Sequence, residues 1–115
     1  MSKYTGTFNV LNTTGRTIYN VNISHSTTDF VSGEINIPEL SDNQTSSKKG
    51  RLETGSGNRD HWNVSFNDAN GTQYSGSHAC GFESEDDGGN VTVSLHHNYF
   101  KMLNPKSSSC ESNYN

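Results

Sequence analysis

Hydrophobic and polar side chains alternate in several short segments of this chain. In residues 5–11, Phe8 and Val10 share one side. Residues 16–25 repeat the pattern most clearly, with one side formed by Tyr19, Val21, Ile23 and His25. A period of two residues is that of a β-strand with one buried face. Because turn residues 12–15 separate the two segments, the pattern predicts an N-terminal hairpin.

Later segments carry the same signal. Residues 30–40 contain Ile35 and Ile37 and include Pro38, which cannot donate to a central ladder, so an edge strand is expected there. Residues 61–66 alternate strictly, and turn residues 68–71 separate them from residues 72–75. We therefore expect a second hairpin whose core-facing side chains are Trp62, Val64 and Phe66.

The remaining segments complete an all-β prediction. The polar stretch 41–57 predicts a long loop with a short strand near Arg51 and Leu52, and residues 90–95 predict another strand. Residues 99–103 either continue that strand beyond a bulge or form a separate one. The expected architecture is a single-domain antiparallel β-sandwich over residues 1–104 with a long polar loop, followed by a loosely held tail at 105–115.

Composition narrows the function classes. The chain has 115 residues, enough for one domain with a modest core. Hydrophobic residues make up 28%, charged residues 17%, and the net charge is −4. A strongly charged disordered chain and a basic nucleic-acid-binding surface are both disfavoured. The sequence has no apolar run long enough to span a membrane and no visible signal peptide, so we expect a soluble protein that is cytoplasmic or released without one.

Candidate chemistry is sparse. No nucleophile elbow, paired-carboxylate signature or phosphate-binding glycine motif is present, so a protein that is not an enzyme is expected. An acidic loop at residues 83–89 offers Glu83, Glu85, Asp86 and Asp87 as oxygen ligands for calcium. The alternative is a solvated, negatively charged turn. Five histidines lack the spacing of a zinc site.

Two cysteines and several aromatic residues leave alternatives open. Cys80 and Cys110 form a disulfide in an oxidising compartment and remain thiols in a reducing one. The aromatic side chains of Tyr74, Tyr99 and Phe100 are candidates for an exposed platform that binds a sugar ring or a lipid headgroup. Alternatively, such rings seal the ends of a small sandwich.

One family resemblance is visible. The segment Phe8-Asn9-Val10-Leu11-Asn12-Thr13-Thr14-Gly15-Arg16-Thr17-Ile18 resembles the first hairpin of the aegerolysin-like β-sandwich proteins. Trp62-Asn63-Val64-Ser65-Phe66, followed by a glycine-containing turn, is a second similarity. The resemblance implies a non-enzymatic sandwich that recognises membrane lipids, in some members as a component of a pore-forming toxin.

Three hypotheses follow. The first is a binding protein that recognises a membrane lipid or acts as a toxin-like component at a cell surface. The second is a lectin-like carbohydrate-binding protein, with calcium required if the acidic loop takes part. The third is a structural homo-oligomer in which the edge strand near Ile35 and Ile37 pairs with a second copy.

Overall fold

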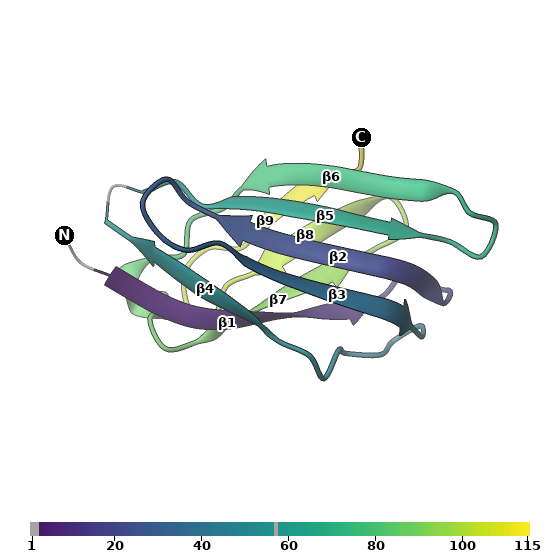
Figure 1. Cartoon of the computed structure of the whole chain (residues 1–115), viewed down its shortest axis with the longest axis horizontal. Coiled ribbons are helices and arrows are strands. Elements are labelled where there is room, and N and C mark those ends of the chain that lie inside the picture. The colour runs from purple at the N-terminus through teal and green to yellow at the C-terminus, as the bar shows by residue number, and fades with distance from the viewer. Residues whose placement is uncertain (1–2, 57) are drawn as a thin grey trace.

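The alternating segments form two β-sheets packed face to face in the computed structural model, which describes residues 3–56 and 58–115 (Figure 1). One sheet has the order β4-β1-β7-β8-β9, with bounds β1 Lys3–Asn12, β4 Gly50–Gly55, β7 Asn90–Leu95, β8 Tyr99–Leu103 and β9 Cys110–Asn113. The other has the order β3-β2-β5-β6, with bounds β2 Ile18–Ser26, β3 Gly33–Leu40, β5 His61–Asn67 and β6 Gln73–Ala79. The expected all-β sandwich is confirmed, but it is not wholly antiparallel, because β1 and β7 pair in parallel.

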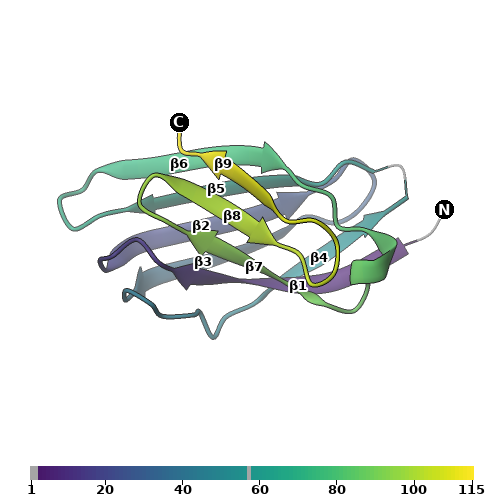
Figure 2. The same cartoon turned by 180° about the vertical axis from the view of Figure 1, so that it is seen from behind.

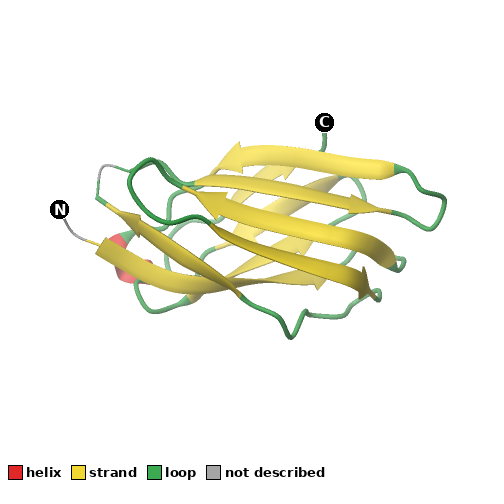
Figure 3. Ribbon diagram, viewed as in Figure 1, coloured by secondary structure: helices red, strands yellow, loops and turns green. Residues whose placement is uncertain are grey.

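Helical structure is minimal in this fold. Within the described residues, the one helical element is the short 3₁₀ turn η1, Ser84–Asp86 (Figure 3). That part of the chain has no helix long and apolar enough to cross a membrane. Met1 and Ser2 of the predicted domain, and Gly57 of the predicted loop, lie outside the described residues.

The core lies between the sheets. One sheet contributes the buried side chains of Phe8, Val10 and Val93 to this core. The other sheet contributes buried residues that include Val21, Ile23, Trp62, Val64 and Phe66. The ring of Phe8 meets that of Trp62 edge to face, with centroids 5.3 Å apart. The prediction that Trp62, Val64 and Phe66 face the core is confirmed.

The predicted N-terminal hairpin is wrong. β1 pairs antiparallel with β4 and parallel with β7, whereas β2 belongs to the opposite sheet (Figure 2). The turn between β1 and β2 therefore crosses from sheet to sheet. Asn12 stabilises this crossing because its side-chain amide donates to the carbonyls of Arg16 and Leu40. Gly15 has a φ of 91°, a conformation that glycine adopts without steric cost.

Tyr19 does not belong to the core face that the alternation predicts. The pairing of β2 with β5 shifts register between Tyr19 and Asn22, and Asn20 has a φ of 51°. Such an extra residue reverses which side chains point inward on the two sides of the bulge. Ile18 is buried before it and Val21 after it, while Tyr19 is half-buried.

The remaining strand predictions hold with adjusted bounds. β3 is an edge strand, and β5 and β6 form the second hairpin. The short strand expected near Arg51 is β4, which covers more of the polar stretch than predicted. Residues 99–103 form the separate strand β8, which pairs antiparallel with β7.

The C-terminal segment is held more firmly than the predicted loose tail. β9 pairs with β8, and Tyr114 packs against the core. Cys80 and Cys110 form a disulfide, which resolves the alternative left open by the sequence. The tail looked polar because β9 is an edge strand whose side chains alternate between half-buried and exposed.

We predict that reducing this disulfide destabilises the fold. The bridge closes a loop with a sequence separation of 30, which corresponds to about 3 to 4 kcal/mol of loop-closure entropy in the unfolded chain. Urea unfolding followed by the fluorescence of Trp62, with and without dithiothreitol, measures the difference. Equal unfolding midpoints would show that β9 holds its place without the bridge.

Candidate functional site

The predicted aromatic platform does not form. Phe100 has no exposed surface and belongs to the core. Tyr74 stacks on the ring of Phe66 at 5.1 Å, and its hydroxyl accepts a hydrogen bond from Arg16. Tyr99 stacks on His96, next to the β7–β8 turn. Tyr74 and Phe100 therefore seal the sandwich, as the alternative reading proposed.

The acidic loop, considered above as a calcium site or a solvated turn, contains a structural anchor. The buried carboxylate of Asp86 accepts hydrogen bonds from the backbone N–H groups of Glu83, Lys106 and Ser107 and from the Ser107 hydroxyl. Asp87 accepts one from the backbone N–H of Thr5 at 2.8 Å. These donors occupy both carboxylate oxygens of Asp86 and one of Asp87. Glu83, Glu85, Asp86 and Asp87 form no group that could hold a metal, and neither do other residues of the described chain.

Asp86 is held as a carboxylate. Its burial raises the pKa, but the hydrogen bonds from Ser107, Glu83 and Lys106 outweigh that effect, so the net pKa lies below its usual 3.8. The charged form is therefore stabilised by folding, and Asp86 joins the η1 turn to the segment that leads into β9.

Two histidines have polar contacts inside the fold. His96 lies between Thr13 and Ser94, whose hydroxyls are 3.0 and 2.6 Å from its two ring nitrogens. Burial, together with the charge of Lys101, lowers the pKa of His96. His25 is different, because it is fully buried and faces a carboxylate.

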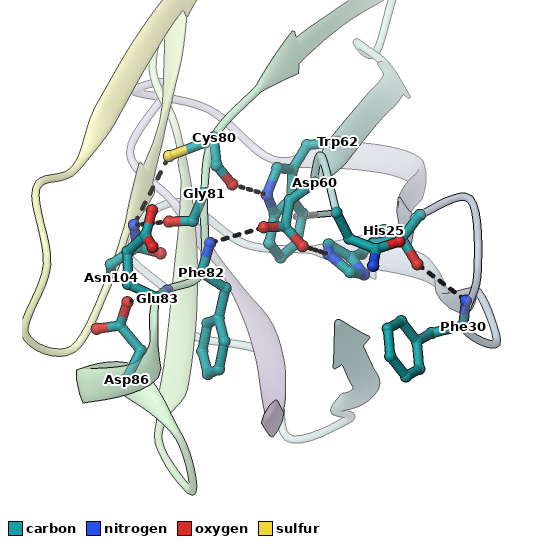
Figure 4. A network of polar contacts seen from close by, with 12 residues as sticks. His25, Phe30, Asp60, Trp62, Cys80, Gly81, Phe82, Glu83, Asp86 and Asn104 are labelled. Carbon is teal, nitrogen blue, oxygen red and sulfur yellow. Dashed lines mark hydrogen bonds and ion pairs between the residues drawn. The ribbon is translucent and has the colours of Figure 1, made fainter. Parts of the chain in front are cut away.

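The pair of His25 and Asp60 is the main polar feature of the core. Nε2 of His25 lies 2.7 Å from Oδ1 of Asp60, whose other oxygen accepts the backbone N–H of Phe82 at 2.8 Å (Figure 4). Nδ1 of His25 is buried with no hydrogen-bond partner among the described residues. A proton on Nε2 lets His25 donate to the Asp60 carboxylate, which can only accept.

Trp62 extends this network. Its ring contacts that of His25 at a centroid distance of 4.8 Å, and its indole N–H donates to the carbonyl of Cys80. The backbone N–H of Cys80 donates in turn to the carbonyl of Asp60. Figure 4 shows His25, Asp60 and Trp62 together, so the buried network connects directly to the disulfide.

Two surface segments lie above the network and form the candidate site. We call them the tip: residues 27–32, which follow β2, and residues 58–60, which precede β5. His25 anchors the first segment and Asp60 the second, and the backbone N–H of Asp29 donates to the side chain of Asn58. Figure 1 shows both connections at the same end of the sandwich as the N-terminus.

The tip exposes a large hydrophobic side chain and an arginine to solvent. Val31 is 68% exposed and is the one large hydrophobic side chain exposed in the part of the chain that the structure describes. Next to it, Phe30 is half-buried. Arg59 is exposed and forms no ion pair with a described residue. A surface depression of about 450 Å³ is lined by Arg59 together with Asn58, Asp60, Ala79, Cys80 and Gly81.

Sequence reasoning missed the tip for a simple reason. The sequence pattern predicts that Phe30 and Val31 begin the edge strand, but β3 begins only at Gly33. The available signal was an apolar pair within a run of Thr, Asp, Ser and Gly, just before the alternating part of the segment.

No protein-family model matches this chain, and no curated protein matches it.

We predict that Asp60→Asn destabilises the fold by about 1 to 3 kcal/mol, because an amide accepts from only one of the two buried donors, His25 and Phe82. Urea unfolding at pH 7, monitored by Trp62 fluorescence, measures the change. The exposed Asp29→Asn is the matched control and should unfold like the unmodified protein. If both variants unfold alike, the buried pair does not stabilise the fold.

We predict a second, pH-dependent effect at Asp86. Since its folded-state pKa is lowered, its stabilisation is present above the usual pKa of 3.8 and is lost as the pH falls through the folded-state value. Asp86→Asn should therefore be less stable than the unmodified protein at pH 7, and the difference should shrink below about pH 4. Unfolding curves at pH 7, 4 and 3 test this. A difference that does not change with pH would contradict it.

Proposed function

We propose that this protein is a non-catalytic domain that recognises membrane lipids with zwitterionic phospholipid headgroups, and that the tip is the surface that contacts them. The observation that carries the proposal is the exposure of Val31 in the same tip as Arg59, a cation that is exposed and forms no ion pair with a described residue. An apolar side chain at the end of a loop gains free energy by entering the acyl boundary of a bilayer.

Charge favours a zwitterionic membrane over an anionic one. The protein has a net charge of −4, so an anionic surface repels it as a whole. Arg59 offers a cation for the headgroup phosphate, and exposed Asp29, on the neighbouring segment of the tip, offers a carboxylate for the ammonium group. The depression beside Arg59 provides space for a headgroup.

A rigid base supports this role. The tip segments are anchored by the His25–Asp60 pair and the Asp29–Asn58 hydrogen bond, so binding orders little additional chain. The similarity of residues 62–66 and the turn after them to aegerolysin-like proteins, which falls on the β5–β6 hairpin, implies the same function class. Binding without catalysis also agrees with the missing catalytic motifs in the sequence.

Co-sedimentation with vesicles tests the proposal. Vesicles of phosphatidylcholine, of phosphatidylethanolamine with phosphatidylcholine, and of phosphatidylserine with phosphatidylcholine are compared. We expect binding to the zwitterionic vesicles and a lower affinity for those with phosphatidylserine. Val31→Ser should weaken binding about tenfold or more, because a buried valine contributes about 1.5 kcal/mol or more. Arg59→Gln should weaken it about fivefold.

Lys49→Gln is the matched control for Arg59→Gln. Lys49 is also exposed and has no ion pair among the described residues, but it precedes β4, at the opposite end of that strand from the tip. The Lys49→Gln variant should bind the vesicles like the unmodified protein. Failure to bind all three vesicle types would overturn the lipid proposal, and equal effects of Lys49→Gln and Arg59→Gln would exclude the tip as the contact.

A further inference from the structure

The outer face of the sheet β3-β2-β5-β6 presents rows of amide and hydroxyl side chains. The inward residues of these strands, such as Ile23 and Val64, are buried, so their neighbours along each strand point outward. The pairing places the outward residues in register across all four strands. One row is Asn36, Asn22, Ser65 and Ser75, and the next is Glu34, Ser24, Asn63 and Ser77.

These side chains are free to bind a ligand. Among residues 3–56 and 58–115, no side-chain hydrogen bond is formed by Asn22, Asn36, Asn63, Ser65, Ser75 or Ser77. Their donors and acceptors are therefore available at the surface. Elsewhere the fold uses its amides internally: Asn12 and Asn104 each donate to backbone carbonyls.

The face is also hollowed. A depression of about 300 Å³ is lined by side chains of β2, β5 and β6, namely Asn22, Asn63, Ser65, Ser75 and Ser77, together with the C-terminal Asn115. The backbone N–H of Asn115 donates to the carbonyl of Ser75 and so closes one side of the depression. Figure 1 views this sheet from its outer side, with β7, β8 and β9 behind it.

The bulge in β2 adds an aromatic ring to the same face. Because the extra residue Asn20 lies between them, both Tyr19 and Asn22 point outward, and Tyr19 is half-buried. Tyr19 pairs with Glu39 and Asn67 in the next row. An aromatic ring beside hydrogen-bonding amides combines an apolar surface with polar groups, as the apolar face and the hydroxyls of a sugar require.

Charge defines the ligand class. The two rows carry no cation, and their single ionised side chain is Glu34 at the edge strand. Phosphate, sulfate and carboxylate groups therefore find no counter-charge within the rows, and Lys48, at the β3 edge, donates its ammonium group to the backbone carbonyl of Asn36. Amides and hydroxyls both donate and accept hydrogen bonds, and so do the hydroxyls of an uncharged sugar.

We propose that this face is a binding site for a neutral oligosaccharide, and that binding does not require calcium. Strands lie about 4.8 Å apart, so four strands present a row of roughly 14 Å, which is longer than one sugar ring and fits an extended chain of several rings. The site is separate from the tip and is independent of the lipid proposal. It also differs from a calcium-dependent lectin site, because the acidic loop takes no part.

Isothermal titration calorimetry with cellohexaose, chitohexaose, mannohexaose and an acidic control, hexagalacturonic acid, tests the proposal. We expect at least one neutral hexasaccharide to bind with an affinity that EDTA does not change, and no binding of the acidic one. Asn63→Ala should weaken the binding of that hexasaccharide about three- to tenfold, the effect of one lost hydrogen-bonding group. Tyr19→Ala should weaken it by a similar factor or more.

Asn98→Ala is the matched control, because Asn98 is an exposed amide in the β7–β8 turn of the other sheet. The Asn98→Ala variant should bind the hexasaccharide like the unmodified protein. Circular dichroism melting should show that all variants are folded. Asn63→Ala should leave vesicle binding unchanged, so failure of this site and failure of the lipid proposal are distinguishable. The proposal is overturned if no neutral hexasaccharide binds, if EDTA abolishes binding, or if Asn63→Ala and Asn98→Ala have the same effect.

Discussion

The carboxylate of Asp60 joins parts of the protein that lie far apart in the chain. It contacts His25 at the end of β2 and accepts the N–H of Phe82, while the Asp60 carbonyl accepts that of Cys80. A carboxylate buried in a low-dielectric core is tolerated only when its hydrogen-bonding capacity is filled. The positions of the tip segments, the β6–η1 connection and the disulfide are therefore coupled. This explains how short loops with few apolar contacts are held in one arrangement.

The strand content of the fold was predictable, but the neighbours of several strands were not. A period of two residues shows which side chains are buried, and it correctly identified the core positions Trp62, Val64 and Phe66. It carries no information on which strand lies next to another. β1 pairs with β7 through contacts such as the hydrogen bond from the N–H of Thr13 to the carbonyl of Leu95, across more than half the chain. The bulge at Asn20 was equally invisible, because asparagine adopts positive φ without any fixed sequence pattern.

The chemistry of the candidate sites was equally hard to predict, because it depends on contacts between distant parts of the chain. Four carboxylates in the acidic loop were easy to see, but whether a carboxylate is free depends on distant donors. For Asp86 these donors are Lys106 and Ser107, about 20 residues later in the sequence. The core-facing position of His25 was predictable, whereas its partner Asp60 lies 35 residues away and follows a polar stretch without alternation. The residues that position the tip could be found only after β2 and β5 were placed side by side.

The two edges of the sheet β3-β2-β5-β6 offer few free backbone groups for strand pairing with a second copy. On one edge, Lys48 donates to the carbonyl of Asn36, and Pro38 has no N–H to offer. Gly33 approaches β4 so closely that a Cβ there would lie 1.8 Å from the carbonyl oxygen of Arg51. On the other edge, Asn115 donates to Ser75 of β6. Both edges are partly covered by the chain itself, whereas among the described residues the outer face carries side chains without hydrogen bonds and the tip carries the exposed Val31.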